Sequence, residues 1–391
     1  MQNEFLATVA ALAQPRAEPA TRGRTVATAV VIGTSAIALA LAAGLAGSGV
    51  TTLVTSLHSR DLRPLADGLT VQGGPHAGRA PVRAVALDDA VDGADVVFLH
   101  SHATAHPMWA GLLAPLLRSG QVVVLVPGRS LGAFEFAAEL RRHGCRADIL
   151  LGEAQTQPHL ATAAGPGVIN WLGTKDVTCV GALPAHRSAE LAATLAAHVP
   201  GVVAAPSALW TGMQNVGGVL HPAAVLLNVT ITERAAGGDD RITFYGDQIS
   251  ETLCRDVLEP LDAERLAVGG ALGLTDLWTA REWVCRTYGV EGDTLARALR
   301  AVPAYRGVPA ARSIDDYGFV SDEVPSSLVP AASLGRALGV ATPATDAIID
   351  LAGVVARADF RATGRTLARL GIDGTPASHL RAVLESGPDG R

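Results

Sequence analysis

The chain has 391 residues, of which 49% are hydrophobic, 17% are charged and only 4% are aromatic, and its net charge is −6. That length predicts two domains, and the acidic balance argues against a nucleic-acid partner, which would require a basic surface. No apolar run approaches the roughly 20 uncharged residues of a membrane span, and residues 1–24 lack the basic start and apolar core of a signal peptide. We therefore expect a cytoplasmic protein that binds neither nucleic acid nor membrane, with four free cysteine thiols.

The first half of the chain alternates short β-rich runs with helical segments, after an N-terminal extension (1–24) that we expect to be a short helix and a polar linker. The strands are predicted at 25–33, 51–56, 82–87, 94–102, 121–128, 147–153, 167–173 and 177–184. The helices are predicted at 36–48, 105–118, 131–143 and about 187–198. Strands that alternate with helices form a parallel sheet that is covered on both faces. Residues 25–205 are therefore predicted to be an α/β Rossmann domain.

The second half is mainly helical, and the change of pattern follows the helix-breaking residues Pro200 and Pro206. Helices are predicted at 221–233, 249–273, 275–288, 293–301, 327–338, 343–358 and 375–385. Pro343 marks one helix start, and Gly289 and Gly339 stand where helices should end. Residues 206–391 are therefore predicted to be an all-α domain.

The turn after the first predicted strand has the spacing of a dinucleotide-binding fingerprint, G-x-G-x-x-G/A. Gly33 and Ala38 match it, whereas Ser35 takes the place of the middle glycine, where the backbone comes closest to a pyrophosphate. The amides and the dipole at the start of the following helix would hold that pyrophosphate. The predicted cofactor contacts in this turn are Gly33, Thr34, Ser35, Ala36 and Ile37.

The end of the second strand distinguishes the two nicotinamide cofactors. An NAD-specific domain usually places an acid there against the ribose 2′-hydroxyl, but this chain has Thr55 and Ser56, with no carboxylate before Asp61. A small polar pair followed by Arg60 suits a 2′-phosphate, which a guanidinium can bind through two hydrogen bonds. We therefore expect NADP(H) to be favoured over NAD(H), with Ser56 and Arg60 as contacts. The alternative is that Arg60 is a solvated surface arginine.

The segment 215–228 places polar side chains in an otherwise apolar run. His221 is predicted at a loop-to-helix junction, with Pro222 in the first helical position and with Asn215 and Asn228 on either side. A lone histidine is more often structural than catalytic, but flanking asparagines in an apolar segment are hard to explain by packing. His221 is therefore the predicted catalytic residue, and Asn215 is a second candidate.

At these residues the sequence resembles the opine (octopine/nopaline-type) dehydrogenases, including the enzymes that complete opine metallophores. The resemblance extends over most of 25–375. Besides 215–228, it is carried by 94–97 with Ala105-His106, 120–129, Glu153 with Gln155-Thr156, 261–265, 288–292, 303–305, 322–325 and 339–349. The order and the spacing of these segments follow the family.

The resemblance implies a reductive condensation, in which the amino group of an amino acid meets the carbonyl of a 2-oxo acid and the imine is reduced by hydride from a nicotinamide. It places the family's catalytic histidine at His221 and the acidic partner in the segment that contains Asp322 and Glu323. An imidazole titrates near pH ~6.5 and can both donate and accept a proton. We expect Glu323 to orient the imidazole, with Asp322 and Asp316 as alternatives.

Two arginines that are typical of the family are absent. The segment 313–321 has Asp315 and Asp316 where an arginine would bind the oxo-acid carboxylate, and Thr162 stands near the position of the other arginine. The nearest replacements are Arg312 and Arg306. We therefore expect a cationic or neutral amine-bearing substrate and a specialised biosynthetic imine or carbonyl reduction rather than a standard opine. The predicted substrate contacts are Glu153, Asp316, Arg312 and Trp210.

Several alternatives stay open at this point. His100 and His102 end the fourth strand and His106 begins the next helix; we expect His102 and His106 to contact the cofactor, against a surface or packing role. Trp210 could lie in an interdomain core instead of the substrate pocket. No set of histidines and acids has metal-site spacing, so no metal is predicted. The alternative functions are a simple 2-oxo-acid or alcohol dehydrogenase and a non-catalytic nucleotide-sensing protein, and a homodimer through the helical domain is left open.

Overall fold

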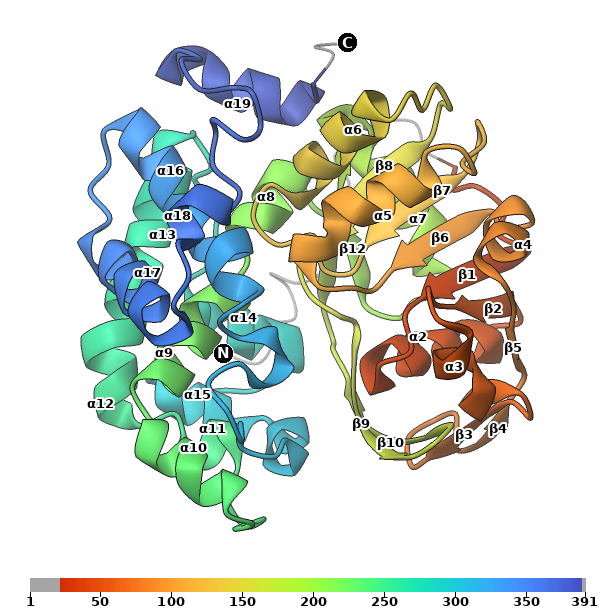
Figure 1. Cartoon of the computed structure of the whole chain (residues 1–391), viewed down its shortest axis with the longest axis horizontal. Coiled ribbons are helices and arrows are strands. Elements are labelled where there is room, and N and C mark those ends of the chain that lie inside the picture. Colours follow the sequence, from red (N-terminus) through yellow and green to blue (C-terminus); the bar gives the residue numbers. More distant parts are fainter. Residues whose placement is uncertain (1–21, 389–391) are drawn as a thin grey trace.

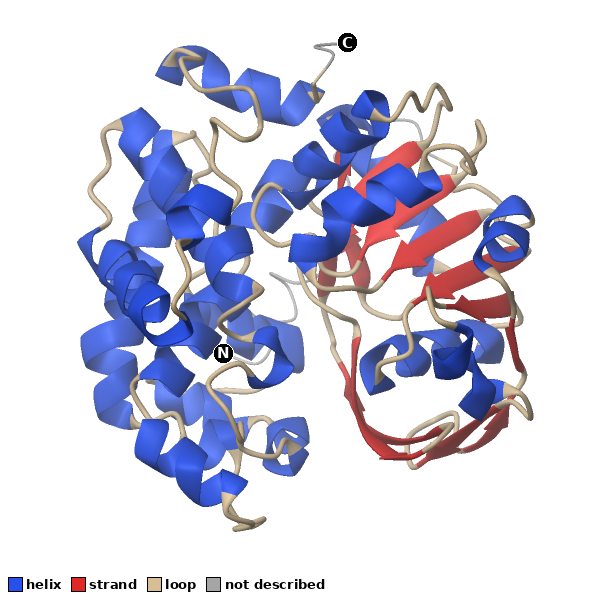
Figure 2. Cartoon of the chain, viewed as in Figure 1, coloured by secondary structure: helices blue, strands red, loops and turns tan. Residues whose placement is uncertain are grey.

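The computed structural model describes residues 22–388, which form an α/β domain and a helical domain side by side (Figure 1). Most of the predicted N-terminal extension, including its short helix, lies outside the described residues. Strands are confined to one half of the molecule, and the other half consists of helices and loops (Figure 2). The predicted fold class, an α/β Rossmann domain followed by an all-α domain, is confirmed.

The α/β domain is built on an eight-stranded sheet with the order β12-β11-β8-β7-β6-β1-β2-β5. Its strands are β1 (Thr28–Ile32), β2 (Thr51–Thr55), β5 (Val82–Ala84), β6 (Val96–Leu99), β7 (Val122–Leu125), β8 (Leu150–Ala154), β11 (Thr178–Leu183) and β12 (Val202–Ala204). All neighbours from β5 to β8 are parallel, as predicted, whereas β11 is antiparallel to β8. Because β1 and β6 are parallel neighbours, their carboxyl ends meet at one edge, where open sheets bind ligands.

Helices cover both faces of this sheet because successive strand residues point to opposite sides. The helices of the domain are α2 (Ala36–Gly47), α3 (Ser59–Leu62), α4 (Leu87–Asp92), α5 (His106–Leu113), α6 (Gly132–Arg142) and α7 (Ser188–Ala196). Val30 and Ile32 of β1 pack with α4, α5 and α6, whereas Ala29 and Val31 pack with α2 and α7. The predicted helices of this half therefore lie on the two faces of the sheet.

A second sheet, with the order β4-β3-β10-β9, packs against α2. Its strands are β3 (Leu69–Gln72), β4 (Gly78–Ala80), β9 (His159–Gly165) and β10 (Val168–Thr174). The prediction that 167–173 belongs to the main sheet is wrong, because Ile169 and Trp171 of this run bury their side chains in the cluster that includes α2. The pattern also misses β3, β4 and β9. β3 and β4 are short, with four and three residues, and β9 is rich in alanine and ends at Gly165.

The helical domain has one large apolar core. Its main helices are α8 (Ala208–Met213), α9 (Gly217–Leu226), α10 (Val229–Ala236), α11 (Phe244–Asp247), α12 (Glu251–Leu253), α13 (Glu259–Ala271), α14 (Ala280–Tyr288), α15 (Leu295–Ala301), α16 (Val329–Leu338), α17 (Pro343–Ala356), α18 (Phe360–Thr363) and α19 (Ala377–Ser386). Gly289 and Gly339 end α14 and α16 in the left-handed conformation, as predicted. Among the described residues no single helix is long and apolar enough to cross a membrane. One bent pair, Ala208–Leu226 with Val229–Ala236, reaches that length and apolar composition only when its two parts are counted together.

The helix that carries His221 begins earlier than predicted. α9 starts at Gly217, so His221 and Pro222 lie inside the helix and the predicted helix 221–233 is two helices, α9 and α10. Glycines are poor helix formers, which places the predicted start too late. The structure uses Gly218 for a close approach, since a Cβ there would lie 2.6 Å from the Cβ of Ser327. The glycine therefore lets α9 pack tightly against the segment that follows Glu323.

An apolar cluster joins the two domains near the predicted boundary at 205/206. Phe134 of α6 packs with Leu209 and Trp210 of α8, and with Leu380 of α19, all of them buried. α19 returns from the C-terminal end of the chain to contact α8 between the domains (Figure 1). This shared core fixes the α/β domain against the helical domain, and the site described next lies between the two domains.

Candidate active site

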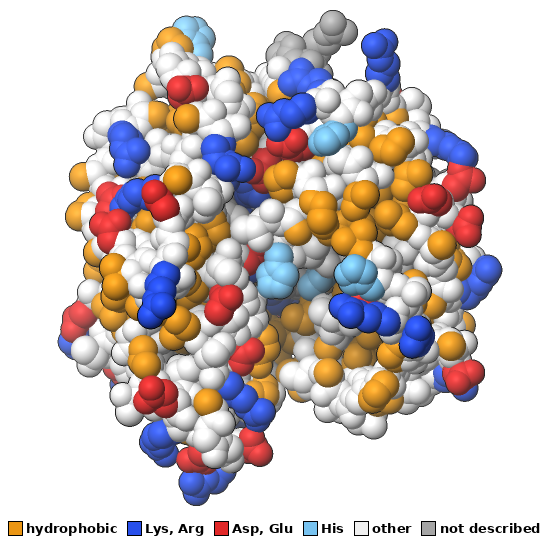
Figure 3. Space-filling model, in the orientation of Figure 1, with side chains coloured by type: hydrophobic (Ala, Val, Ile, Leu, Met, Phe, Trp, Pro, Cys, Tyr) orange, Lys and Arg blue, Asp and Glu red, His pale blue; other side chains and the backbone are white. Residues whose placement is uncertain are grey.

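A cavity of about 410 Å³ lies between the two domains. One wall comes from the carboxyl edge of the main sheet, after β1, β6 and β7, and the opposite wall comes from the helical domain around His221 and Glu323. Residues from the ends of β9 and β10 form a third side. In the space-filling view a furrow runs between the two halves of the molecule, with histidine side chains at its rim (Figure 3). The cavity therefore lies where the fold predicts a ligand site.

The ring of His221 is held by a carboxylate, a phenol and an aromatic face. Its Nδ1 lies 2.8 Å from Oε1 of Glu323, and its Nε2 lies 3.2 Å from the hydroxyl of Tyr245. Phe319 stacks on the ring with the centroids 4.3 Å apart. A carboxylate can only accept, so Nδ1 carries the proton and Nε2 is the acceptor that faces Tyr245. Of the acids predicted as partners, the structure brings Glu323 to His221, rather than Asp322 or Asp316.

Arg129 keeps this carboxylate ionised although Glu323 is only 1% exposed. It follows β7, and its Nη2 lies 2.8 Å from Oε1 of Glu323, the oxygen that also contacts His221. Burial pushes the pKa of Glu323 up, but Arg129 and His221 outweigh burial and hold that pKa below its usual value. Arg129 was not among the predicted site residues. Its position directly after a strand, in 120–129, is the signal that could have identified it.

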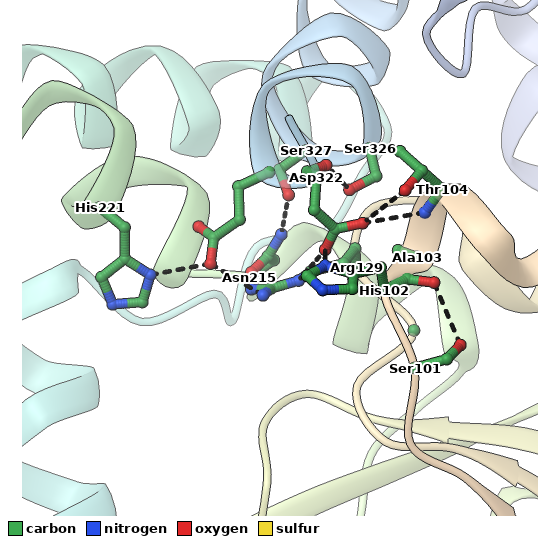
Figure 4. Close-up of polar contacts among 12 residues, drawn as sticks. Ser101, His102, Ala103, Thr104, Arg129, Asn215, His221, Asp322, Ser326 and Ser327 are labelled. Atoms are coloured by element: carbon green, nitrogen blue, oxygen red, sulfur yellow. Dashed lines mark hydrogen bonds and ion pairs between the residues drawn. The ribbon is translucent and has the colours of Figure 1, made fainter. Parts of the chain in front are cut away.

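Asp322 links the two domains instead of contacting His221 (Figure 4). It accepts hydrogen bonds from the backbone N and the hydroxyl of Thr104, at 2.9 and 3.1 Å. Its Oδ2 lies 3.8 Å from Nδ1 of His102 and 3.9 Å from Nε of Arg129. Burial raises its pKa, but His102, Arg129 and the Thr104 bonds outweigh burial, so the pKa of Asp322 is far below its usual value and that of His102 is raised. Asp322 and His102 therefore form a cross-domain contact at the edge of the cavity.

Asn215 ties the segment before α9 to the segment that carries the two acids. Its Nδ2 donates to Oγ of Ser327 at 2.7 Å, and its side chain is buried and lines the cavity (Figure 4). This contact joins the loop before α9, the helix that carries His221, to the segment that follows Glu323. The structure thus places Asn215 beside the cavity, between the segments of these two residues.

The turn after β1 has the shape that a pyrophosphate requires. Gly33 has φ +132°, and a Cβ there would lie 2.4 Å from the carbonyl oxygen of His100, so no side chain fits. Ser35 caps α2 by accepting a hydrogen bond from the backbone N of Ala38 at 3.2 Å. The first turn of α2 contains no acid, and Ser35 and Ile37 line the cavity. The turn from Gly33 to Ile37 can therefore hold a dinucleotide pyrophosphate at a helix N-terminus.

The end of β2 is less simple than the sequence pattern suggests. Oγ of Ser56 donates to a carboxylate oxygen of Asp61 at 3.1 Å, and Nε of Arg60 lies 3.6 Å from the other oxygen. The Arg60 side chain is 75% exposed. Within the short helix α3, Asp61 therefore lies beside both Ser56 and Arg60, the two predicted cofactor contacts. Arg60 is exposed to solvent, and its side chain could turn toward a 2′-phosphate.

Two predicted site residues are buried away from the cavity, which corrects their assignment. His106 is fully buried and packs edge-to-face on Phe136, and burial lowers the pKa of its ring to about 3. Glu153 lies at the end of β8, where its carboxyl accepts hydrogen bonds from the backbone N of Ala133 and from Thr211. Both side chains are buried in the packed interior of the α/β domain. His106 begins α5 and Glu153 lies near the end of β8. They do not contact a cofactor or substrate in the described cavity.

Three further predicted substrate contacts also lie elsewhere. Trp210 is buried in the interdomain core, where its Nε1 donates to Asp276 at 3.0 Å, so the core alternative holds. Arg312 extends outward to pair with Asp240 at 2.7 Å, and Asp316 accepts from the backbone N of Arg312 at 2.8 Å. Neither Arg312 nor Asp316 lines the described cavity, and Asp315 does not line it either. The acids at 315 and 316 therefore have no contact there through which they would select a cationic substrate.

The buried carboxyl of Glu153 makes stability depend on pH. Burial raises its pKa to about 8, against the hydrogen bonds from Ala133 and Thr211. A carboxyl with a raised folded-state pKa favours folding below its unfolded pKa, and that contribution is lost as the pH rises through the folded pKa. We expect the unfolding free energy of the wild type to fall relative to Glu153→Gln between pH ~5 and pH ~9. Urea denaturation at these pH values measures the difference, and a difference that stays constant would contradict the raised pKa.

The sequence pattern misses much of the cavity wall. Lys175 follows β10 and lines the cavity together with Gln155 and Thr156. The helical domain adds an aromatic wall of Phe244, Tyr245, Trp283, Tyr288, Tyr305 and Phe319. Several of these residues lie in segments that carry the family resemblance, but no local pattern marks Lys175. Its position depends on the second sheet, which the sequence did not predict.

A cleft with a pyrophosphate-binding turn on one wall and a carboxylate-oriented imidazole on the other defines a two-domain nicotinamide-dependent dehydrogenase. Residues 204–356 match the family model described as NAD/NADP octopine/nopaline dehydrogenase, alpha-helical domain. The chain is 31% identical to the opine dehydrogenase of Arthrobacter sp. (strain 1C) over 350 residues, which cover 88% of this chain and 95% of that relative. The chain therefore belongs to the opine dehydrogenase family, as the resemblance implied, and is an NAD(P)-dependent dehydrogenase that acts on CH–NH substrates.

Two groups of solved structures share the fold at lower identity. Octopine dehydrogenase in complex with NADH and agmatine has a TM-score of 0.67 and 21% identity, over 90% of this chain and 97% of that one. Yersinopine dehydrogenase bound to NADP+ has a TM-score of 0.62 and 14% identity, over 92% and 98% of the two chains. These neighbours use different nicotinamide cofactors, so the fold alone does not select between NAD and NADP.

Proposed function

We propose that this enzyme uses NADPH to reduce the imine that forms between an amine or amino acid and a 2-oxo acid or related carbonyl, as a step of a specialised biosynthetic pathway. The observation that carries the proposal is the 2.8 Å contact between Nδ1 of His221 and Glu323, which orients the ring so that Nε2 lies beside the Tyr245 hydroxyl in the cavity lining. One solved neighbour holds NADH with agmatine, an amine. A cytoplasmic location and a homodimer through the helical domain stay predictions.

His221 supplies the proton transfers that such a condensation requires. Nε2 takes a proton from the amine as it attacks the carbonyl carbon, the resulting oxyanion takes a proton from solvent to become a hydroxyl, and Nε2 returns its proton to that hydroxyl, which leaves as water. Glu323 stabilises the imidazolium between these steps, and Arg129 keeps Glu323 ionised. Bound reduced nicotinamide supplies hydride to the imine carbon. The turn from Gly33 to Ile37 would hold its pyrophosphate.

A substrate screen tests this proposal. Amines and amino acids are combined with 2-oxo acids in the presence of NADPH or NADH, and loss of absorbance by the reduced cofactor is followed. Turnover that requires both an amine and a carbonyl supports imine reduction. Turnover without an amine would instead identify a simple 2-oxo-acid or alcohol dehydrogenase, and cofactor binding without turnover by any pair would favour a nucleotide sensor.

The NADP preference is tested at the exposed arginine after β2. We expect Arg60→Ala to weaken NADPH binding about 10-fold or more, because a guanidinium–phosphate contact is charge-assisted, and to leave NADH binding nearly unchanged. The control is Arg255→Ala, since Arg255 is 69% exposed and lies far along the chain in the helical domain. Fluorescence titration gives both affinities. Equal losses for the two cofactors would refute the preference and would point to Asp61 as a ribose contact.

A further inference from the structure

Lys175 is a buried cation without a counter-ion. It is only 4% exposed, and its Nζ donates to Oγ1 of Thr156. Nζ also lies 5.5 Å from the ring centroids of both Trp283 and Tyr288. Among residues 22–388, no carboxylate lies within ion-pair distance of this ammonium group. A buried charge that lacks a partner is costly, so its retention inside a ligand cavity points to a partner that arrives with the ligand.

Gln155 is a second unsatisfied polar group in the same part of the cavity. Its side chain is 5% exposed, and neither its Nε2 nor its Oε1 has a hydrogen-bond partner among the described residues. It precedes Thr156 in the chain, and both line the cavity with Lys175. Buried amides are normally paired, so an unpaired one beside a ligand site indicates a missing ligand atom. An ammonium, an amide N–H₂ and a hydroxyl together suit an anion that accepts several hydrogen bonds.

The remaining charges of the cavity are already neutralised. Arg129 lies against Glu323 and Asp322, and those two acids also contact His221 and His102. Lys175 is therefore the one lysine or arginine of the described cavity lining without an acid beside it. Burial and the nearby charge of Arg129 lower the pKa of its ammonium group to about 7, and a bound anion would favour the protonated form.

Between Lys175 and His221 the wall is aromatic. Tyr245 and Tyr305 stack with centroids 3.5 Å apart, and the Tyr305 hydroxyl donates to that of Tyr288 at 2.8 Å. Burial raises the pKa of all three phenols well above the usual value, so they stay neutral. Trp283 completes this wall. Such a surface suits an apolar or aromatic group, and Lys175 would repel a cationic one.

We propose that Lys175, with Gln155 and Thr156, forms a subsite for a substrate carboxylate, and that the aromatic wall selects an apolar or aromatic side chain on the same substrate. This inference rests on the proposed function, since it names the substrate class of that reaction. The carboxylate can belong to the amino acid or to the 2-oxo acid. In either case the cationic substrate expected from Asp315 and Asp316 is replaced by an anionic, hydrophobic one.

Direct binding tests the subsite without requiring turnover. The probe is 3-phenylpropionate, which has an aromatic ring and a carboxylate but neither amine nor carbonyl, and its matched controls are 3-phenylpropionamide and 3-phenylpropylamine. By calorimetry on the full chain we expect the carboxylate to bind roughly 10- to 100-fold more tightly than the amide. Lys175→Met should remove this preference, and Lys175→Arg should retain part of it. Tighter binding of the amine than of the carboxylate, or an unchanged preference in Lys175→Met, would overturn the subsite.

The pH dependence of this binding gives a second readout. Lys175 must be protonated to hold a carboxylate, and its pKa is about 7 without a ligand. Among the titratable groups around it, His159 is neutral because burial lowers its pKa to about 3, the Tyr288 phenol is neutral because burial raises its pKa, and Arg129 is paired with Glu323. We expect affinity for 3-phenylpropionate to fall as the pH rises from about 6 to about 9, and to stay flat for Lys175→Arg. A wild-type affinity that does not change with pH would contradict the role of the ammonium.

Kinetics assign the carboxylate to one of the two substrates. Phenylalanine is compared with 2-phenylethylamine at fixed pyruvate, and phenylpyruvate with phenylacetaldehyde at fixed amine. In Lys175→Met we expect KM to rise roughly 10- to 100-fold for the carboxylate-bearing member of one comparison, and the compound that lacks the carboxylate to be unaffected. If Lys175→Met changed KM equally for the compound with the carboxylate and the compound without it, in both comparisons, the subsite would be refuted. Turnover by the wild type would still support the proposed function. A wild type that turns over no pair but binds 3-phenylpropionate through Lys175 would refute the proposed function and uphold the subsite.

Discussion

His221→Ala should lower turnover by about 100- to 10,000-fold while leaving dinucleotide binding intact. The variant removes the group that carries protons to and from the reacting nitrogen and oxygen, and it leaves the turn from Gly33 to Ile37 unchanged. Glu323, Tyr245 and Phe319 hold the ring of His221, and among these neighbours only the Tyr245 hydroxyl lies beside Nε2, where its raised pKa makes it a poor proton acceptor. Steady-state turnover with the best substrate pair, combined with a fluorescence titration of the reduced cofactor, separates the two effects.

The control for this experiment is His379→Ala, an exposed histidine on α19 that lies outside the cavity. It should keep wild-type turnover and cofactor affinity. A His221→Ala enzyme with unchanged turnover would remove the imidazole from the mechanism. If cofactor affinity fell as steeply as turnover, the residue would instead have a role in building the cleft.

Arg129→Met should have the largest effect on stability, about 3–5 kcal/mol, because it leaves Glu323 as a buried and uncompensated charge. Glu323 is 1% exposed and Asp322 is 4% exposed, so both carboxylates have very little contact with solvent. Asp322 keeps its bonds to Thr104, whereas Glu323 keeps only His221. Urea denaturation of the two proteins measures the loss.

The same substitution should change the pH dependence of turnover. Arg129 and His221 hold the pKa of Glu323 below its usual value against the effect of burial, so removal of Arg129 raises that pKa. Glu323 must be ionised to orient the imidazole, and residual turnover of the variant should therefore increase toward higher pH relative to the wild type. The wild type should show no such increase.

A double variant distinguishes lost charge pairing from general disruption. Arg129→Met combined with Glu323→Gln removes the cation and its partner together, so it should be more stable than Arg129→Met alone. Additive losses would show that the two side chains do not depend on each other. Their 2.8 Å contact would then have little energetic weight.

From the sequence alone, His221 and the turn after β1 could be proposed as site residues because their signals are local. Gly33 is required by the backbone conformation of a single turn. Helices of the second half end at glycines such as Gly289, which adopts the left-handed conformation. His221 stood out through its neighbours and the family resemblance. Its partner could only be narrowed to three acids, because the fold decides which carboxylate reaches a ring 102 residues away in sequence.

The positions of Asp315 and Asp316 remove the basis on which they predicted a cationic or neutral substrate, and the reason is physical. Sequence position shows that two acids lie near Glu323, but it does not show where their side chains point. In the structure Asp316 caps its own turn through the backbone N of Arg312, and Asp315 accepts from the backbone N of Ser321 at 2.7 Å. Acids in turns often satisfy nearby amides in this way, which removes them from the cavity.

By itself the sequence predicted the two-domain architecture, a pyrophosphate site in the turn after β1 and a catalytic role for His221, because backbone conformation, hydrophobic periodicity and capping act between residues close together in the chain. Only the tertiary structure decided the charge and shape of the substrate cavity. Arg129, Lys175 and Tyr288 come from three separate segments, and they meet because the second sheet and the interdomain core bring those segments together. Electrostatic partners are set by distance in space, and distances between such segments are not encoded in any local pattern.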